Sequence, residues 1–578
     1  MSFVRTYVRL RRRTSWIDLF VFAGIAALLF GLLSVGKEWS GELRPRVDID
    51  LSPSALPKYT FFSLVRGFAA YGVSLAFTLV YGYVAAYNKR AEKIMLPLLD
   101  ILQSIPVLGF LPGLVLALVA TFPNSNLGLE LACVLMIFTG QVWNMTFSFY
   151  NSLRSLPEEL REAASVYKLN WWQRFIKLEL PYSAMGLIWN SMMSMAGGWF
   201  FLTITEAFVL GDKDFRLPGI GSYMSVAIAH GDIRAMLSAV LAMILMILLV
   251  DQLFWRPIVA WAQKYKFEET ESAQVEKSLV LDLLQRSQLL KFARERVWQP
   301  TSAASMRVLQ GAVALEQVEE KKNESATKYL KLAFTWLARA AVIALLFYGA
   351  GKLFSLLFSV NLAAWINILF RLLLTLVRVS VAVIIGTLIM IPIGVAIGLN
   401  PKLSRILQPV VQVTASFPAP MLFPLVILAL SSAGVGIEVG AIVLMLLGTQ
   451  WYILFNVIAG AMGIPHDLRE AARVARLTQW QTWKRLILPG IFPSLVTGWV
   501  TATGGAWNAS IVAEYVHFGN KNLIATGLGS LITTATDAGN FGMLAAGVIA
   551  MATTVVLINK FFWRRLYAIA ENRYSLNK

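Results

Sequence analysis

The sequence predicts an all-α polytopic membrane protein made of two tandem parallel repeats, each with about six transmembrane helices. Three observations indicate this fold class. Of the 578 residues, 57% are hydrophobic and 15% are charged, which is far from the composition of an average soluble domain. Long apolar runs follow one another along the chain, and the second half repeats the first. An even number of spans in each half makes both copies face the same way.

The apolar runs have about the 20 residues that a helix needs to cross a bilayer. In the first half they cover residues 17–35, 61–87, 94–120, 129–150, 184–210 and 236–257. In the second half they cover residues 332–350, 365–399, 404–430, 437–458, 491–517 and 541–562. We therefore expect a first repeat at 1–262, a cytoplasmic linker at 263–330 and a second repeat at 331–578. The polar linker is interpreted as a tether, with a regulatory module as the alternative.

The basic residues around short loops predict the orientation of these spans. Lysine and arginine cluster before the first span, after the second and after the fourth, within residues 5–13, 89–93 and 154–177. Because cytoplasmic loops carry this excess, both termini are expected in the cytoplasm. The net charge of +18 follows from the same bias, so nucleic acid is not an expected partner.

Other simple sites are excluded or disfavoured. Cys133 is the one cysteine and lies within an apolar run, while His230, His466 and His517 are scattered, so neither a disulfide nor a metal site is expected. The arginines at 11–13 precede the first apolar run as in a secretion signal. No convincing cleavage site follows, and we expect an uncleaved first span.

The duplication can be followed residue by residue. In the earlier part of each half, matching residues lie 312 positions apart, as Pro97 and Pro409 do. In the later part they lie 308 positions apart, as Trp143 and Trp451 do. A pathway along the axis between two parallel copies would be lined by both of them.

A short phrase recurs in a polar, basic interval of each half. Leu160, Arg161, Glu162, Ala163 and Ala164 form the first copy, and Leu468, Arg469, Glu470, Ala471 and Ala472 form the second. Apolar residues at i, i+3, i+4 and i+7 predict a short helix with a narrow face of small side chains. Leu160, Ala163, Ala164 and Tyr167 form this face in the first copy, and Leu468, Ala471, Ala472 and Ala475 form it in the second.

The start of the first short helix resembles a capping box, with Ser155 three residues before Glu158. We expect both helices to dock a partner outside the membrane, and Glu162 and Glu470 to bond to a donor on that partner. A solvated loop helix is the alternative. The matched repetition of the two copies argues against it.

With these residues in view, the chain resembles the membrane subunits of ATP-binding cassette importers, whose cytoplasmic signature is Glu-Ala-Ala, three residues, Gly and a later Leu-Pro. The resemblance covers both halves and excludes the linker. It is most similar to the duplicated permeases of the nitrate, sulfonate, taurine and bicarbonate type, which implies a type I importer-like fold. The residues that carry this likeness are Arg66 and Arg378, Ser104-Ile105-Pro106 and Ser416-Phe417-Pro418, and Gly-rich spans ending at Glu206 and Glu514.

One departure from the family signature is plain. The glycine after Glu-Ala-Ala is replaced by Lys168 in the first copy and by Arg476 in the second. Such a glycine would end or bend the helix. Without it, we expect the coupling helix to run longer or to carry a charged contact to its partner.

The resemblance implies a division of labour. The chain would form the pathway for a small anionic solute, an extracytoplasmic substrate-binding protein would deliver that solute, and two cytoplasmic ATP-binding subunits would each engage one coupling helix. No phosphate-binding loop G-x-x-x-x-G-K-[S/T] occurs in the sequence. ATP and Mg²⁺ are therefore expected on partner subunits, and this chain is expected to hold no cofactor and to be no enzyme.

Candidate pathway residues are the ionisable groups inside spans and the serines of the Ser-x-Pro breaks, namely Arg66, Ser104, Glu206, Arg378, Ser416 and Glu514. Ionisable side chains are costly in a bilayer and usually face protein or water. The arginines could attract an anion or line a gate; alternatively, Arg–Glu pairs lock helices together. The breaks free backbone groups that can line a channel, although a simple kink is the commoner outcome. The external loops 211–235 and 519–540 are expected to receive the binding protein.

Two other classes of protein stay open. An ion-gradient-driven secondary transporter could also have 6+6 parallel repeats, but paired docking helices are not its natural mark. A membrane scaffold or enzyme is disfavoured because no nucleophile–base constellation occurs and no large extramembrane domain is predicted.

Overall fold

The computed structural model describes residues 16–41, 47–104, 106–210, 213–265, 279–287, 336–337, 340, 344, 347–518 and 521–574. They fall into two compact units. One unit comprises Met1–Ser34 and Ala273–Ser359, and within it lie α13 (Leu279–Arg286) and a short apolar helix, Phe347–Phe358. The other comprises Val35–Ser272 and Val360–Lys578 and holds the bundles of both repeats. Helix α2 (Trp16–Trp39) crosses the boundary between these ranges.

The chain is an all-α polytopic membrane protein, as predicted. In the part that the structure describes, eight helices are long and apolar enough to cross a membrane. They include the predicted spans at 17–35, 61–87, 129–150, 236–257, 365–399, 437–458, 491–517 and 541–562. The predicted span at 184–210 is the 27-residue helix α9, which ends at Glu206. The predicted span at 332–350 lies mostly outside the described residues.

The first repeat contains one continuous series of elements. After a 3-10 turn η1 (Pro53–Ala55) these are α3 (Leu56–Tyr87), α4 (Lys89–Ser104), α5 (Val107–Thr121), α6 (Leu127–Arg154), α7 (Glu158–Val166), α8 (Trp171–Arg174), the π-helical turn η2 (Phe175–Glu179), α9 (Leu180–Glu206), β1 (Val209–Leu210), β2 (Lys213–Asp214), α10 (Ile220–His230), α11 (Ile233–Val250), the π-helical turn η3 (Asp251–Trp255), α12 (Arg256–Ala262) and the 3-10 turn η4 (Gln263–Tyr265).

The second repeat has the same series at the spacing that the sequence predicts. Its elements are α17 (Leu362–Leu399), α18 (Pro401–Ser416), the 3-10 turn η6 (Ala419–Met421), α19 (Phe423–Ser432), α20 (Ile437–Met462), α21 (His466–Val474), α22 (Gln479–Thr482), the π-helical turn η7 (Trp483–Ile487), α23 (Leu488–Ala513), β3 (Tyr515–Phe518), β4 (Lys521–Ile524), α24 (Leu528–Asp537), α25 (Phe541–Ile558), the π-helical turn η8 (Asn559–Trp563) and α26 (Arg564–Tyr574). Even the π-helical turns recur 308 residues apart.

The prediction of one continuous third span in each repeat is wrong. In place of 94–120 and 404–430 the chain forms two shorter helical pieces, α4 and α5 in the first repeat and α18 and α19 in the second. Pro106 and Pro418 lie at the breaks in extended backbone, as does Phe417. Proline has no N–H to donate and disfavours a helical residue before it. The Ser-x-Pro segments therefore end a helix rather than kink it.

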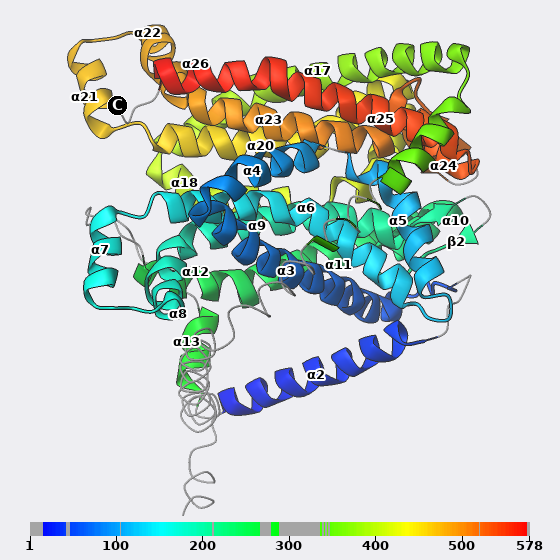
Figure 1. Cartoon of the computed structure of the whole chain (residues 1–578), viewed down its shortest axis with the longest axis horizontal. Helices are drawn as coiled ribbons and strands as arrows, with labels where there is room; N and C mark the ends of the chain where they lie inside the picture. The colour runs from blue at the N-terminus through cyan, green and yellow to red at the C-terminus, as the bar shows by residue number, and fades with distance from the viewer. Residues whose placement is uncertain are drawn as a thin grey trace, which may run out of the picture. The chain divides into compact units, whose positions relative to one another are not determined.

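The two repeats interlock through these broken spans. Helices α4 and α5 of the first repeat pack against α25 of the second, and α5 also contacts α23. Reciprocally, α18 packs against α9 and α11, and η6 packs against α9 (Figure 1). Within each repeat the main packing is α3 on α6 and α6 on α9, or α17 on α20 and α20 on α23. Each third span is thus shared with the opposite repeat.

One small antiparallel hairpin follows α9 in the first repeat, and another follows α23 in the second. Val209 pairs with Asp214 in β1–β2, and Tyr515 pairs with Ile524 in the longer β3–β4. Helices α10 and α24 come next, so the predicted loops 211–235 and 519–540 contain ordered structure. In Figure 1, α10 and α24 lie at one end of the bundle, and α7, α8, α21 and α22 lie at the other.

Candidate functional site

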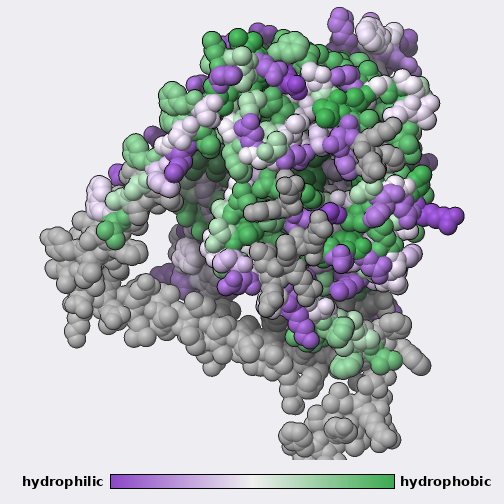
Figure 2. All heavy atoms as spheres, turned by 90° about the vertical axis from the view of Figure 1, so that its right-hand side faces the viewer, coloured by the Kyte–Doolittle hydropathy of each residue, from purple (hydrophilic) through white to green (hydrophobic). Residues whose placement is uncertain are grey.

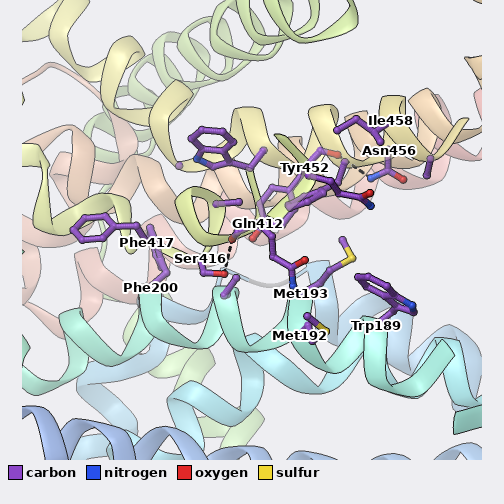
Figure 3. A pocket seen from close by; sticks show the side chains of 18 of the residues that line it. Trp189, Met192, Met193, Phe200, Gln412, Ser416, Phe417, Tyr452, Asn456 and Ile458 are labelled. Atoms are coloured by element: carbon purple, nitrogen blue, oxygen red, sulfur yellow. Dashed lines mark hydrogen bonds between the residues drawn. The ribbon is translucent and has the colours of Figure 1, made fainter. Parts of the chain in front are cut away.

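A cavity of about 430 Å³ lies between the two repeats. Its walls come from α9 of the first repeat and from α18, η6 and α20 of the second (Figure 3). The bulkiest lining side chains are aromatic: Trp189, Phe200, Phe417, Trp451, Tyr452 and Phe455. Among the described residues that line this cavity, none is Asp, Glu, Lys, Arg or His. Its polar side chains are amides and hydroxyls.

Ser416 is the predicted pathway residue that lines this cavity. Its hydroxyl donates to the carbonyl oxygen of Gln412 over 2.8 Å, within its own helix (Figure 3). Gln412 and Asn456 also line the cavity, and the amide nitrogen of Asn456 donates to the carbonyl oxygen of Tyr452 over 2.8 Å. Ser104, the counterpart of Ser416, has a side chain that lies outside the described part of the structure.

The predicted residues Arg66 and Glu206 meet in a buried ionic cluster away from the cavity. Arg66 Nη1 donates to Glu206 Oε1 over 2.8 Å, and Arg66 Nε and Nη2 donate to the two oxygens of Glu130 over 2.6 and 2.7 Å. Ser63 Oγ donates to Glu206 over 2.7 Å. All of these side chains are buried. Each charge has a partner of opposite sign, which offsets the cost of burying it in a membrane protein.

Glu206 also holds the start of α10. The amide of Gly221 donates to Glu206 Oε2 over 2.9 Å, and a carboxylate is favoured at a helix N-terminus. A Cβ atom at Gly219 would overlap the Glu206 carboxylate. The cluster therefore joins α3, α6, α9 and α10, and glycine is required where the backbone approaches the carboxylate.

The second repeat contains the same cluster with one difference. Arg378 Nη1 donates to Glu514 Oε1 over 2.9 Å, and Gly529 donates to Glu514 Oε2 over 2.8 Å. Arg378 also pairs with Glu438, whose other oxygen accepts from the amide of Thr526. At the equivalent place the first repeat has Pro218, which has no N–H. Glu130 instead binds Arg66 through both oxygens.

The difference extends to solvent exposure. The Glu130 side chain is 0% exposed, whereas the Glu438 side chain is 52% exposed. Both clusters lie at the end of the bundle that carries α10 and α24. Arg66, Glu206, Arg378 and Glu514 thus join helices, and none of the four lines the cavity.

The repeated phrase forms α7 and α21, and each of these helices ends at the same point. Leu169 N donates to Ala164 O and Lys168 N donates to Ser165 O, both over 3.0 Å, and Leu477 and Arg476 repeat these bonds to Ala472 and Arg473. This hydrogen-bond pattern is a Schellman motif, in which the residue after the cap is left-handed and usually glycine. Lys168 and Arg476 occupy it with φ of 50° and 49°.

The expectation that the helix runs longer without glycine is therefore wrong. The helices end at Val166 and Val474, because the closing hydrogen bonds hold a lysine and an arginine in a conformation that L-residues rarely adopt. The predicted capping box is also wrong. Pro157 precedes the first helical residue, and Ser155 Oγ donates instead to the carbonyl oxygen of Ser152.

The predicted face of small side chains is only partly exposed in α7, where Ala164 is buried and Leu160 is half-buried. The surface of α7 is turned instead toward Ala163, Val166 and Tyr167, and Val166 is 78% exposed.

In α21 the predicted face is itself exposed at Leu468, Ala471 and Ala475, while Ala472 is half-buried. Val474, the counterpart of Val166, is exposed as well. Both helices thus carry exposed apolar side chains, as at a docking surface.

The charged residues of the repeated phrase differ between the copies. Arg161 points back toward the bundle, where Nη2 donates to the carbonyl oxygen of Leu153 over 2.7 Å. Glu162 is exposed. Glu470 accepts from Arg473 over 2.9 Å, but the residue equivalent to Arg473 in the first copy is Ser165. The Glu470 carboxylate is thus already paired within its own helix, whereas the exposed Glu162 carboxylate of the matching surface has no arginine at the equivalent position.

The segments after α7 and α21 are tied to the bundle by different chemistry. In the first repeat Glu179 is buried, pairs with Arg174 over 2.7 Å and accepts from Tyr87 Oη over 2.7 Å. In the second repeat the equivalents of Tyr87 and Glu179 are Leu399 and Ile487, which belong to one apolar cluster. Polar contacts in the first repeat and apolar contacts in the second thus hold the equivalent segments against the bundle.

A second cavity of about 500 Å³ lies between α10 and α24 at the opposite end. Figure 2 views this end, where hydrophilic side chains are interspersed among hydrophobic ones. Arg216, His517 and Asp537 are among its lining residues. Arg216 pairs with Asp214 over 2.7 Å. Burial raises the pKa of the Asp537 carboxyl above its usual range, while Tyr515 and His517 act in the opposite direction.

These features define a class of protein: a membrane-embedded, internally duplicated helical chain with a cavity between its repeats and a matched pair of surface helices at one end. Residues 78–254 and 390–575, together more than half of the chain, match the family described as "Binding-protein-dependent transport system inner membrane component". The chain belongs to this family, whose members are the membrane permease components of such systems.

Several curated relatives are similar to parts of the chain. The nitrate import permease protein NrtB of Synechocystis sp. is 27% identical over 29% of this chain and 58% of its own length. The putative aliphatic sulfonates transport permease protein SsuC of Bacillus subtilis is 24% identical over 25% of the chain and 49% of its own length. The bicarbonate transport system permease protein CmpB of Synechococcus elongatus is 27% identical over 36% and 68%. The chain spans little more than half the length of NrtB.

Sequence reasoning missed two kinds of functional residue. Glu130 and Glu438, which complete the ionic clusters, are acidic residues 308 positions apart in apolar surroundings, and that repetition was a usable signal. The aromatic and amide lining of the cavity carried no such signal, because it is assembled from helices of both repeats. Among the described residues no cluster of His, Cys, Asp and Glu could hold a metal ion.

Proposed function

We propose that this chain forms the translocation pathway of an ATP-driven, binding-protein-dependent importer of a small anionic solute. The observation that carries this proposal is the pair α7 and α21, two matched helices with exposed apolar residues at one end of a duplicated bundle. Two equivalent ATP-binding subunits could each dock on one of them. The names of the relatives, which refer to nitrate import, bicarbonate transport and putative sulfonate transport, support an anionic solute.

The proposal includes the partners and the setting of the chain. Two cytoplasmic ATP-binding subunits would hold ATP and Mg²⁺, and this chain would hold no cofactor. An extracytoplasmic substrate-binding protein would dock at the end formed by α10, α24 and the two hairpins. The chain would lie in the bacterial inner membrane with α7, α21 and both termini on the cytoplasmic side.

The composition of the complex tests the proposal first. Native mass spectrometry of the chain purified from its own membranes should find one copy of it with two ATP-binding subunits. Reconstituted with its binding protein, that complex should take up solute only with ATP. Isolation of the chain without an ATP-binding subunit, together with uptake driven by an ion gradient alone, would contradict the proposal and favour a secondary transporter.

The orientation can be tested separately with one cysteine. Cys133 is 2% exposed, so a thiol reagent should label the natural chain very little. Val166→Cys should react with a membrane-impermeant maleimide from the cytoplasmic side only. Labelling from the external side would reverse the proposed orientation.

A further inference from the structure

The cavity between the repeats is informative about the chemistry of the solute. We propose, building on the transport function above, that the cavity binds an organic anion with an apolar body and a single compact head group, and not a bare inorganic oxyanion. The charge and the hydrogen-bonding groups of the lining, the size of the cavity and a comparison of the two repeats all point to such a solute.

The lining offers no charge to balance a bare inorganic anion. The described lining residues include no Lys, Arg or His, and most of them are aromatic or aliphatic. An ion that leaves water needs compensating charge or hydrogen bonds, and the faces of aromatic rings carry partial negative charge. Such walls favour an apolar body and disfavour a small, strongly hydrated oxyanion that would touch them on every side.

Hydrogen-bonding groups are nevertheless present, and they are few. Gln408, Gln412 and Asn456 contribute side-chain amides, and Figure 3 shows Gln412 and Asn456 among methionine and aromatic side chains. Amide N–H groups can donate to the oxygens of one sulfonate or carboxylate head group. A few polar groups in a mostly apolar pocket is the usual composition of a site for an organic ligand.

The size of the cavity fits the same solute. Pockets of roughly 300–1,000 Å³ accommodate drug-sized organic molecules, and the cavity has a volume of about 430 Å³. An inorganic oxyanion of four or five atoms would fill only a small part of it and would have to keep its water. An aryl or alkyl body fills the rest and contacts the aromatic walls.

The duplication shows that the fold does not require this lining. Trp189 and Phe200 in α9 correspond to Thr497 and Asn508 in α23, and Tyr452 in α20 corresponds to Asn144 in α6. These three positions thus carry polar residues in the other repeat of the same membrane protein, whereas Trp451 and Phe455 are matched by Trp143 and Phe147. Trp189, Phe200 and Tyr452 are therefore not required by the fold and are specific to this cavity.

Protection of a cysteine in the cavity wall tests the inference with defined probes. In the complete complex, Met193→Cys would be reacted with a maleimide in the presence of benzenesulfonate, sulfate or nitrate. Benzenesulfonate and sulfate share their oxyanion chemistry and differ in the apolar body and in net charge, while nitrate has the same single charge as benzenesulfonate and no apolar body. We expect saturable protection of at least threefold by benzenesulfonate and none by the two inorganic anions. Arg90→Cys, at an exposed position that neither lines the cavity nor lies on α7 or α21, is the control and should react equally under all conditions.

A second variant tests whether the aromatic wall causes the protection by benzenesulfonate. Tyr452→Asn introduces the residue that the other repeat has at this position, and it should weaken protection by benzenesulfonate about three- to tenfold. Equal or better protection by sulfate or nitrate would overturn the inference, as would no protection by any probe. The rate of maleimide labelling is measured in the absence of ATP, so this experiment does not depend on transport activity. An unprotected cavity in a complex that still takes up solute with ATP would refute only the solute class, whereas protection in a chain without ATP-dependent uptake would refute only the transport function.

Discussion

Arg66 and Glu206 form an ion pair of 2.8 Å that is buried on both sides, and Arg378 and Glu514 repeat it at 2.9 Å in the second half of the chain. The partners lie 140 and 136 residues apart and join the second span-forming helix of each repeat to the helix that ends beside the hairpin. The surroundings of the two pairs differ, and this difference leads to the first prediction.

Arg66→Met should destabilise the chain more than Arg378→Met. The first change leaves Glu130 and Glu206 buried without a cation, which typically costs about 3–5 kcal/mol. The second also leaves Glu514 buried without a cation, but Glu438 is half exposed and stays bonded to the Thr526 amide, so the total cost should be smaller. Thermal unfolding of the purified variants in detergent measures this, with the exposed Arg90→Met as the control. Equal midpoints for Arg66→Met and Arg378→Met would contradict the asymmetry.

Lys168→Gly should stabilise the end of α7. A left-handed backbone costs an L-residue about 1–2 kcal/mol relative to the right-handed form, and glycine largely avoids this cost. The amides of residue 168 and Leu169 should therefore exchange hydrogen about fivefold more slowly, which corresponds to roughly 1 kcal/mol. Hydrogen exchange followed by mass spectrometry checks this.

Two further variants control the Lys168 experiment. Lys168→Val should speed exchange, because a β-branched residue tolerates a positive φ least. Glu159→Gly should also speed exchange, since glycine weakens a position inside α7. Faster exchange in Lys168→Gly would show that the lysine side chain, and not the backbone conformation, holds the helix end.

Replacing Glu162 and Glu470 together by Gln should uncouple ATP hydrolysis from transport while the fold is kept. Between the single variants, Glu162→Gln should have the larger effect, because Glu470 is already paired with Arg473. The ratio of solute taken up to ATP hydrolysed in the reconstituted complex is the measurement, and Glu158→Gln in the first turn of α7 is the control. Uptake at the natural level in the double variant would refute the coupling role.

Asp537→Asn should stabilise the chain at neutral pH and not in acid. Partial burial of its carboxyl raises the pKa of Asp537, so the folded chain favours the protonated carboxyl. Because the residue is exposed overall, solvent screens this effect and the gain in stability should be small. Its contribution is present below the unfolded pKa of about 3.9 and is lost as the pH rises through the folded pKa. Because asparagine resembles the protonated form, the unfolding midpoints of the variant and the natural chain should differ at pH 7 and converge near pH 4. A difference independent of pH would contradict this assignment.

The larger features of the fold could be predicted because their signals are local. The length of apolar runs predicts spans, and the repetition of residues such as Trp143 and Trp451 predicts two copies with the same elements. The same local signals wrongly predicted one continuous helix across Pro106 and another across Pro418. Hydropathy continues across these prolines, and a proline does not by itself show that a helix ends, since Pro97 and Pro409 lie inside α4 and α18.

The candidate site could be predicted only in part, because its contacts are tertiary. The sequence indicates Arg66 and Glu206 as costly residues in spans, but Glu130, which completes the cluster, becomes a partner only when α6 packs on α3. Likewise, the loss of glycine at position 168 is visible in the sequence. The two hydrogen bonds that keep its left-handed backbone are visible only in the structure.

The packing of each third span against the opposite repeat has a consequence for how the two halves are held together. Helices α4 and α5 pack against helices of the second repeat, while α18 and η6 pack against helices of the first. Each half therefore makes direct contacts with the other. The covalent connection between the halves is then not what keeps them in register. Two separate genes encoding the two halves should give polypeptides that find each other in the bilayer, and a chain joined end to end should differ from such a pair mainly in how fast the pair assembles.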